Sequence, residues 1–273
     1  MSDMGLDSTQ LERYSRHVIM EGVGADGQGA LLDAAVLVVG AGGLGSPVIQ
    51  YLAAAGVGTI GIADDDVVER SNLQRQVIHR DADVGRSKVE SAAEFVNGLN
   101  PDVDVRTHET RITGANVEEL IAQYDFVVDG SDNFPTRFLI NDACTLTGTP
   151  FAHGAVYKFE GQVTTFDGGE DGPCYRCLFP EAPEEGTVPS CAETGILGSL
   201  PGTVGAIEAT ETLKSLIDVG ERLSGRLLLF DSMDMSFEEV PIRQNPDCPV
   251  CGDDPAIESV AEVEYSGRCA LED

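Results

Sequence analysis

Short apolar runs alternate with amphipathic stretches along the first half of the chain. Residues 35–39 and 59–63 are apolar runs of strand length, and the apolar stretch 45–55 between them has the length of a helix. The alternation continues, with strands expected at 103–106, 125–129 and 151–156 and helices at 84–99, 117–123 and 135–147. Strands that alternate with helices are typical of a mostly parallel sheet with helices on both faces. The pattern therefore predicts an α/β, Rossmann-like fold.

The pattern changes in the second half of the chain. Residues 159–166 no longer alternate with helices and are predicted to form an antiparallel strand. A segment rich in Pro, Gly and Glu, 179–195, is predicted to be a mobile crossover loop, and an apolar helix is expected over 202–217. Two further strands are expected at 226–230 and 236–240. We therefore expect the sheet to end in an antiparallel portion.

The two ends of the chain are more polar. A helix is predicted over 9–20, a glycine-rich stretch at 22–27 should break it, and a short second helix should reach Asp33. The last twenty or so residues are acidic and are predicted to be peripheral. The first residues lack an apolar signal core and no run approaches the length of a membrane span, so a cytoplasmic protein is expected.

The charge of the chain is strongly unbalanced. Lys and Arg number 17 against 47 Asp and Glu, which gives a formal net charge of −30. Such a surface should repel nucleic-acid phosphates and anionic membranes, so no membrane partner and no stable nucleic-acid binding are expected. Only three lysines are present and the acids are spread along the chain. We interpret this as adaptation to a high-salt, halophilic cytoplasm; an acidic partner-binding face is the alternative.

A glycine-rich loop follows the first apolar strand. Gly40-Ala-Gly-Gly-Leu-Gly45 has the form G-x-G-x-x-G between a strand and a helix, and Asp64 ends the next strand, where a ribose-binding carboxylate is expected. The glycines let backbone N–H groups approach a phosphate at a helix N-terminus. NAD and ATP both satisfy these conditions. A tight strand–helix turn without a ligand is the plainer alternative.

Basic residues distinguish the two ligands. A triphosphate carries more negative charge than a dinucleotide and usually requires cations and Mg²⁺. Arg75 lies shortly after Asp64, and Lys88, one of the three lysines, opens the next predicted helix. They could instead balance neighbouring acids such as Asp81 and Asp83. The charge argument favours phosphate binding.

A carboxylate-rich turn follows the fourth predicted strand, Asp129-Gly-Ser-Asp132-Asn133. The carboxyl edge of a parallel sheet is where ligands of such folds collect, and hard oxygen ligands suit Mg²⁺. We expect Asp132 to be linked to Mg²⁺ and Asn133 to lie at the nucleotide. A helix N-cap in front of Pro135 is an alternative that can coexist.

Two Cys-x-x-Cys pairs, Cys174/Cys177 and Cys248/Cys251, are separated by 70 residues and must meet through the fold. Four thiolates at this spacing suit a closed tetrahedral Zn²⁺ site, which is structural because no coordination position stays open. A disulfide or redox pair is the alternative.

The other three of the seven cysteines differ in setting. Cys191 lies in the predicted crossover loop, where a thiol can reach a substrate; nucleophile and ordinary small residue are both open from spacing alone. We assign no function to Cys144 on an apolar helix face or to Cys269 in the acidic tail.

Taken together, these motifs resemble those of the MoeB/ThiF ubiquitin-activating-like enzymes, including the archaeal members that activate small ubiquitin-like modifiers. The likeness covers about residues 11–252 and rests on Arg13-Tyr-Ser-Arg16-His, the glycine loop, Asp64-Asp-Asp66, Ser71-Asn-Leu-Gln-Arg-Gln76, Val84-Gly-Arg-Ser-Lys88, Asp129-Gly-Ser-Asp-Asn133 and both cysteine pairs. The resemblance implies a homodimer that binds Mg-ATP and adenylates the terminal carboxylate of a sulfur-carrier protein ending in Gly-Gly.

The resemblance also implies roles for individual residues. Gly43 and Asp64 would hold the nucleotide with Asp66 nearby, the phosphates would be surrounded by Asn72, Arg75 and Lys88, and Asp132 would be the Mg²⁺-linked acid. Arg16 would act as an arginine finger on the ATP of the other subunit. Cys191 would take the activated carboxylate as a thioester or handle sulfur.

The predicted organisation is a single adenylating domain, 1–252, with a nucleotide-binding half at about 11–157 and a carrier-binding and zinc half at about 158–252, followed by an acidic tail, 253–273. Nothing after Gly252 resembles a rhodanese domain, so a sulfurtransferase would have to be a separate protein. Three alternatives stay open: an NAD-dependent Rossmann oxidoreductase, a non-enzymatic partner subunit, and a relative that adenylates a tRNA base, which the acidic composition disfavours.

Overall fold

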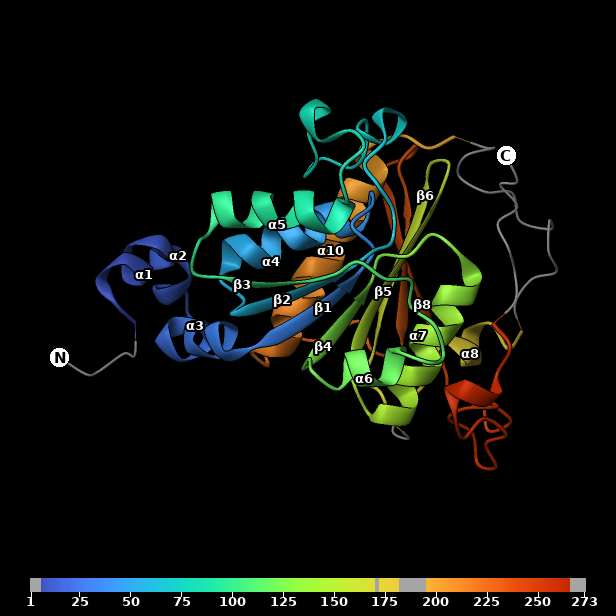
Figure 1. Cartoon of the computed structure of the whole chain (residues 1–273). Helices are drawn as coiled ribbons and strands as arrows, with labels where there is room; N and C mark the ends of the chain where they lie inside the picture. The colour runs from blue at the N-terminus through green and yellow to red at the C-terminus, as the bar shows by residue number, and fades with distance from the viewer. Residues whose placement is uncertain (1–5, 170–171, 182–194, 266–273) are drawn as a thin grey trace.

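A single eight-stranded sheet organises the computed structural model, which describes residues 6–169, 172–181 and 195–265. The strand order is β3-β2-β1-β4-β5-β6-β7-β8 (Figure 1). Strands β1 to β5 run parallel, and β6, β7 and β8 continue the sheet in antiparallel pairs. The predicted α/β architecture with an antiparallel end is therefore confirmed.

The parallel half follows the sequence pattern closely. Its strands are β1 (Ala35–Val39), β2 (Thr59–Ala63), β3 (Asp104–His108), β4 (Phe126–Asp129) and β5 (Phe151–Tyr157). Its helices are α4 (Gly45–Ala55), α5 (Lys88–Leu99), α6 (Val117–Ile121) and α7 (Phe134–Thr147). The central strands β1 and β4 are buried along nearly all their length, because helices cover both faces of the sheet.

The antiparallel half contains β6 (Glu160–Phe166), β7 (Arg226–Asp231) and β8 (Ser236–Pro241), with α8 (Tyr175–Leu178) and α10 (Ser199–Leu216) between β6 and β7. The short helix α8 was not predicted. Helix α10 packs against β5, β6 and α4. One core layer contains residues of α4, α5 and the end of α10, and the other contains residues of α6, α7 and α8. Alternate residues of β1 point into the two layers, Val36 and Val38 into the first and Leu37 and Val39 into the second.

The N-terminal prediction needs two corrections. The expected helix over 9–20 is two short helices, α1 (Ser8–Arg13) and α2 (Ser15–Val18), which meet at Tyr14. The chain turns there because the buried Tyr14 ring fits over Gly56 and its hydroxyl accepts a hydrogen bond from Asn100 at 2.8 Å. Helix α3 (Gly24–Asp33) begins inside the stretch expected to break the helix.

Part of the C-terminal segment predicted to be peripheral packs against the core. Val260, in a short 3-10 helix (Val260–Glu262), is 1% exposed and joins the core layer of α7. The Tyr265 hydroxyl donates to Asp142 Oδ2 of α7 at 2.8 Å. Of the described helices, none has the length and apolar character needed to span a membrane.

Candidate active site and cysteine cluster

The glycine loop between β1 and α4 is shaped by close backbone contacts. Gly40 has φ 96°, and a Cβ there would lie 2.9 Å from the Gly130 carbonyl oxygen. A Cβ at Gly45 would lie 1.8 Å from the Gly40 carbonyl oxygen. Gly40 requires a positive φ and Gly45 lies against a backbone carbonyl, so only glycine fits at either position. The loop therefore places open backbone N–H groups at the N-terminus of α4, as phosphate binding requires.

Asp64, at the end of β2, links this loop to Lys88. Its Oδ2 accepts from Ala41 N at 2.8 Å, and its Oδ1 lies 3.9 Å from Lys88 Nζ. Lys88 Nζ also forms an ion pair with Asp66 Oδ2 at 2.6 Å, although the lysine side chain is only 6% exposed. Burial raises the pKa of Asp64, and the charge of Lys88 opposes that shift. The structure thus brings together Asp64, Asp66 and Lys88; their role at a nucleotide stays a prediction.

Arg75 lies on the other side of the glycine loop. Its Nη2 donates to Asn72 Oδ1 at 2.9 Å, and a Cβ at Gly43 would lie 3.4 Å from Arg75 Cγ. Within the described part of the chain, no carboxylate forms an ion pair with Arg75. Lys88 is paired with Asp64 and Asp66 and not with the acids proposed as its alternative partners. Arg75 therefore offers a guanidinium beside the loop that is not neutralised by an acid.

The turn after β4 also meets the glycine loop. A Cβ at Gly130 would lie 3.1 Å from Gly45 N, so the two turns pack backbone to backbone. Asp132 is exposed, and among the described residues its side chain receives a single long contact, 3.5 Å, from Asn133 Nδ2. Asn133 Oδ1 accepts from Thr136 N at 3.0 Å and caps α7, so the N-cap alternative holds for Asn133. The structure places Asp132 at the rim of the site; its metal role stays a prediction.

His79 supports the loop and was not identified from the sequence. It is buried, its Nε2 lies 2.9 Å from the Ala41 carbonyl oxygen, and its Nδ1 lies 2.9 Å from Ser91 Oγ. Since the carbonyl can only accept, Nε2 carries the hydrogen and Ser91 donates to Nδ1. Burial lowers the pKa of His79, which keeps the ring neutral. The sequence holds only four histidines, but none stands in a pattern that reveals this contact.

Arg16 does not lie in the site formed by its own chain. It is an exposed residue of α2, which packs near Gly56 through Tyr14, at the C-terminal end of α4. The glycine loop is at the opposite end of this 11-residue helix, about 16 Å away. Figure 1 shows α1 and α2 at one extreme of the molecule, beside α3. Arg16 is therefore distant from the glycine loop of its own chain.

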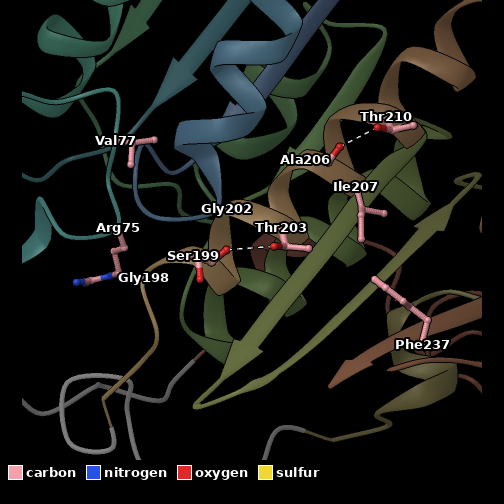
Figure 2. Close-up of a pocket in the computed structure, with 10 residues that line it drawn as sticks. All are labelled: Arg75, Val77, Gly198, Ser199, Gly202, Thr203, Ala206, Ile207, Thr210 and Phe237. Atoms are coloured by element: carbon pink, nitrogen blue, oxygen red, sulfur yellow. Dashed lines mark hydrogen bonds between the residues drawn. The ribbon is translucent and has the colours of Figure 1, made fainter. Parts of the chain in front are cut away.

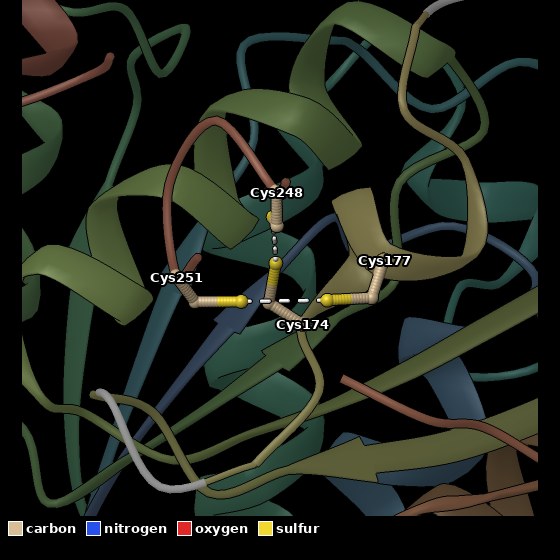
Figure 3. Close-up of side chains that lie close together, drawn as sticks. All are labelled: Cys174, Cys177, Cys248 and Cys251. Carbon is tan, nitrogen blue, oxygen red and sulfur yellow. Dashed lines mark hydrogen bonds between the residues drawn. The ribbon is translucent and has the colours of Figure 1, made fainter. Parts of the chain in front are cut away.

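Figure 3 shows the side chains of the four cysteines converging. One pair comes before α10 in the chain and the other follows β8. Their sulfur atoms all lie within 4.8 Å of one another. Cys174 Sγ is 3.5 Å from Cys248 Sγ and Cys177 Sγ is 3.4 Å from Cys251 Sγ, too far for disulfides. Sulfurs around tetrahedral zinc, with bonds of 2.3 Å, stand about 3.8 Å apart. The donor set therefore fits Zn²⁺.

Contacts around the cluster tie it to the body of the protein. Asn245 N donates to Cys177 Sγ at 3.3 Å, which suits a thiolate. The neighbouring Arg176 forms a two-point ion pair with buried Asp142 of α7, with both N–O distances 2.7 Å. These contacts fasten α8 and the segment after β8 to α7.

The remaining cysteines divide into two groups. Cys191 and Cys269 lie outside the described residues, so the predicted role of Cys191 stays a prediction. Cys144 is fully buried in α7, and burial raises the pKa of its thiol. A buried neutral thiol is unreactive, in agreement with its assignment to no function.

A hollow of about 630 Å³ opens beside Arg75 along the outer side of α10 (Figure 2). It extends over Ser199, Thr203 and Ile207 to Phe237 of β8. A second hollow of about 190 Å³ shares Thr210 with the first and reaches His17 and Tyr51. We call the outer side of α10 between them the α10 stripe; it is formed by Ser199, Gly202, Thr203, Ala206, Ile207, Thr210 and Leu213. The stripe carries no charge in a chain of −30.

The inner side of α10 carries an unusual acid. Glu208 is fully buried, and neither carboxyl oxygen has a hydrogen-bond partner among the described residues. A Cβ at Gly154 would lie 2.5 Å from the Glu208 carboxyl, so the acid fills the space that this glycine leaves. Burial and then the charge of Asp129 raise the pKa of Glu208 well above its ordinary value, which Arg137 only partly offsets. The surroundings of Glu208 therefore favour the neutral carboxylic acid over the carboxylate.

Replacing Glu208 with glutamine is expected to stabilise the fold. The difference in free energy of unfolding between the variant and wild type should grow by about 1.4 kcal/mol for each unit by which the pH rises. The folded pKa lies above the unfolded value of about 4.3, so wild type loses stability as the pH rises between the two values. Glutamine has no proton to lose and avoids this loss. Urea unfolding of both proteins from pH 5 to pH 8 measures the difference.

Glu211→Gln on the same helix is the matched control. Glu211 is buried but satisfied, since its carboxylate accepts from Leu223 N at 2.7 Å and from Lys214 Nζ at 2.5 Å. Its replacement should destabilise the fold by about 1–3 kcal/mol, opposite in sign to the Glu208 change, because it removes a carboxylate oxygen that accepts a hydrogen bond. Parallel stability curves for wild type and Glu208→Gln would show that Glu208 does not hold its proton.

Comparisons with known proteins agree on one family. The model of the ThiF family matches residues 14–250. The chain is 63% identical over 268 residues to the SAMP-activating enzyme E1 of Haloferax volcanii, covering 98% of each chain. It is 50% identical over 266 residues to the sulfur carrier protein adenylyltransferase of Thermus thermophilus, covering 96% of this chain and 97% of the relative.

Solved structures support the same fold. MccB of E. coli superposes with a TM-score of 0.80 over 93% of this chain and 75% of MccB, at 22% sequence identity. The glycine loop, the cations beside it and the cysteine cluster thus occur in a chain whose sequence matches one family over nearly its whole length. The chain belongs to the ThiF family.

Proposed function

We propose that this protein is an adenylyltransferase that activates the C-terminal Gly-Gly carboxylate of a ubiquitin-like or sulfur-carrier protein with ATP. The observation that carries the proposal is the placement of Arg75 and Lys88 on either side of a glycine loop. The carrier carboxylate attacks the α-phosphorus, an O–P bond forms, the bond to the β-phosphate oxygen breaks, and pyrophosphate leaves. Fixed cations lower this barrier because the reaction brings anions together.

The described residues suit each part of the nucleotide. The open loop around Gly43 offers backbone N–H groups to phosphate, and Asp64 would accept from ribose hydroxyls. Asp66, Asn72, Arg75 and Lys88 surround the phosphate end. Asp132 and Asn133, at the rim, would face a Mg²⁺ ion and the nucleotide. Mg²⁺, when bound, would neutralise charge on the phosphates.

A homodimer would complete the site. Arg16 is far from the glycine loop of its own chain, at the other end of α4. The uncharged α10 stripe runs between α2 and the Arg75 region, with exposed Tyr51 and Phe237 beside it. We propose that this stripe meets a second copy, which would bring the partner's α2 towards Arg75.

The cysteine cluster would hold Zn²⁺ as a structural ion. All four donors are thiols, and a tetrahedral site with four protein ligands leaves no position for a substrate. When bound, zinc would hold the segment after β8 against α8 and contribute folding free energy. Thiolates in this role agree with a reducing, cytoplasmic location.

The step after adenylation would use Cys191. Its thiolate would attack the acyl-adenylate, forming a thioester and releasing AMP; with a persulfide from a separate sulfurtransferase, an acyl-disulfide would form instead. The products would serve sulfur transfer, as in molybdopterin synthesis and tRNA thiolation, or protein conjugation. The relatives named as SAMP-activating enzyme and sulfur carrier protein adenylyltransferase support both branches.

The NAD-dependent oxidoreductase alternative is not favoured. It explains the glycine loop and Asp64 but gives no role to Lys88, to the cysteine cluster or to Arg75, which forms no ion pair among the described residues. The named relatives are activating enzymes and adenylyltransferases. Binding of NAD(H) without binding of ATP would restore this alternative.

The proposal predicts ATP–pyrophosphate exchange that requires a carrier ending in Gly-Gly. Each candidate carrier should support exchange, and removal of its last glycine should abolish exchange because the attacking carboxylate moves out of reach. Cys191→Ser should keep the exchange but lose the thiol-sensitive adduct between enzyme and carrier. Radiolabelled pyrophosphate incorporation and non-reducing electrophoresis measure the two steps.

Cys144→Ala is the matched control for the cysteine variant, since the Cys144 thiol is buried in α7. It should keep both exchange and adduct. Exchange that is equal with full-length and shortened carriers would contradict the proposed substrate, and loss of exchange in Cys191→Ser would contradict the separation of the two steps.

A further inference from the structure

Asp129 ends β4 and fixes the turn that follows it. Its side chain is 1% exposed. One carboxylate oxygen, Oδ1, accepts from Ser131 N at 3.1 Å and from Ser131 Oγ at 2.5 Å. These two hydrogen bonds from Ser131 to Asp129 therefore hold the turn in place. The other oxygen, Oδ2, is free of the turn and faces β5.

His153 of β5 binds that second oxygen. The two residues are register partners on neighbouring parallel strands, and His153 Nδ1 lies 2.8 Å from Asp129 Oδ2. Because a carboxylate can only accept, Nδ1 carries the hydrogen. Nε2 is buried without a partner among the described residues. One imidazole N–H is thus directed at the carboxylate that holds the turn.

The turn controls two parts of the nucleotide site. Gly130 donates its N–H to the Val39 carbonyl at 2.9 Å and packs on Gly40 and Gly45 of the glycine loop. Two residues later the turn presents Asp132 at the rim. A shift of Asp129 would therefore move the floor of the glycine loop and the carboxylate expected to face Mg²⁺.

The surroundings keep the pair in one charge state. Burial would raise the pKa of Asp129, but the hydrogen bond from His153, the charge of Arg137 and the hydrogen bond from Ser131 outweigh it, so the pKa is lowered. Burial lowers the pKa of His153. The other titratable groups nearby are Arg137 and Cys144 on α7, Tyr175 on α8 and Glu208 on α10. The pair is an Asp129 carboxylate with a neutral His153.

We propose that His153 is a positioning residue for adenylation, which holds the Asp129 turn, and with it the glycine loop and Asp132, in the geometry that binds Mg-ATP. This rests on the proposed function. His153 contacts neither substrate; it acts through Asp129. Its ring is in turn held by an edge contact with Tyr175, with ring centroids 4.8 Å apart.

The test compares His153→Leu with His153→Asn in ATP–pyrophosphate exchange as a function of pH. Leucine removes the donor, so the buried Asp129 should bind a proton at higher pH, and the acid limb of kcat/KM for ATP should move up by about one pH unit or more. KM for Mg-ATP should rise about tenfold with a smaller change in kcat. Asparagine places an amide N–H where Nδ1 was and should restore the wild-type limb. His108→Leu, which loses the hydrogen bond between His108 of β3 and the Tyr124 hydroxyl, is the control and should keep the wild-type limb.

A second measurement does not depend on catalysis. Hydrogen exchange of residues 39–45 and 129–133 should quicken in His153→Leu and stay slow in His153→Asn and His108→Leu. If wild type shows no ATP–pyrophosphate exchange activity with any carrier, the proposed function fails, while the hydrogen-exchange measurement still decides whether His153 holds the turn.

Should His153→Leu fail to fold, Asp129→Asn replaces it. Without a titrating group at position 129, the acid limb of kcat/KM should vanish. A wild-type acid limb and KM in folded His153→Leu, an acid limb that persists in Asp129→Asn, or unchanged hydrogen exchange would each overturn the proposal.

Discussion

Replacing Lys88 or Arg75 with alanine is expected to lower carrier-dependent ATP–pyrophosphate exchange by about 10²–10³-fold. Lys88 reaches the site as an almost buried ammonium beside Asp64, and Arg75 offers a guanidinium that no described carboxylate neutralises. Each change removes fixed positive charge from where a triphosphate and a carboxylate must meet. Exchange rates at saturating and limiting Mg-ATP separate kcat from KM.

The two variants differ in what they do to the fold. Lys88→Ala leaves Asp64 and Asp66 without their cation, so its stability has to be checked by thermal unfolding. Arg75→Ala breaks no ion pair among the described residues and should fold normally. Arg106→Ala, which removes a positive charge from an exposed pair with Asp104 on β3, is the control. Normal AMP formation by well-folded Arg75→Ala would contradict the phosphate-binding role.

The Lys88 variant also tests the proposed contribution of Arg16 from a second chain. Arg16→Ala should be inactive alone, like Lys88→Ala. Equal amounts of the two, mixed and allowed to exchange subunits, should recover about one quarter of wild-type activity, because half of the dimers are mixed and each has one intact site. No recovery in a mixture that demonstrably forms mixed dimers would mean that Arg16 does not act across the interface.

Removing zinc is expected to have the second large effect. Chelation, or Cys248→Ser, should lower the free energy of unfolding by roughly 5 kcal/mol and the melting temperature by roughly 10–20 °C. The reason is geometric: the cluster joins segments that come before α10 and after β8 in the chain, and without the proposed cation nothing bonds the four thiols to one another. Zinc content by atomic absorption, measured with calorimetric unfolding, checks the prediction.

Cys144→Ser provides the comparison for the zinc-ligand variant. It also places a serine at a buried cysteine, but one outside the cluster, so it should keep a full zinc content. Equal melting temperatures of zinc-loaded and zinc-depleted wild type would show that the cluster does not stabilise the fold.

Most of the parallel half could be predicted because its information is local. The apolar runs of β1 and β2 and the helix α4 between them begin and end where the pattern places them, since burial on both faces demands continuous apolar residues. The glycine loop and Asp64 are recognisable for the same reason: their geometry is set within one strand–turn–helix unit. The cysteine pairs are recognisable by their spacing.

The features that the sequence did not reveal depend on contacts between distant segments. The break between α1 and α2 is made by Tyr14 packing on Gly56 and Asn100. His79 and His153 act through a carbonyl and a carboxylate on other elements, and neither stands in a motif. The docking of Val260 and Tyr265 depends on the surface of α7. Periodicity reports which face of an element is buried, but not which distant group it meets.

The α10 stripe has a consequence for the proposed association of two copies. Molecules that each carry 30 excess negative charges repel one another from any direction, and the work of bringing them into contact is least where the facing surfaces hold no acid. Dissolved ions shorten the range of that repulsion without weakening apolar contact. A medium rich in salt therefore favours the approach of two such chains through their neutral sides. Salt has the reverse effect on complexes that are held together by opposite charges.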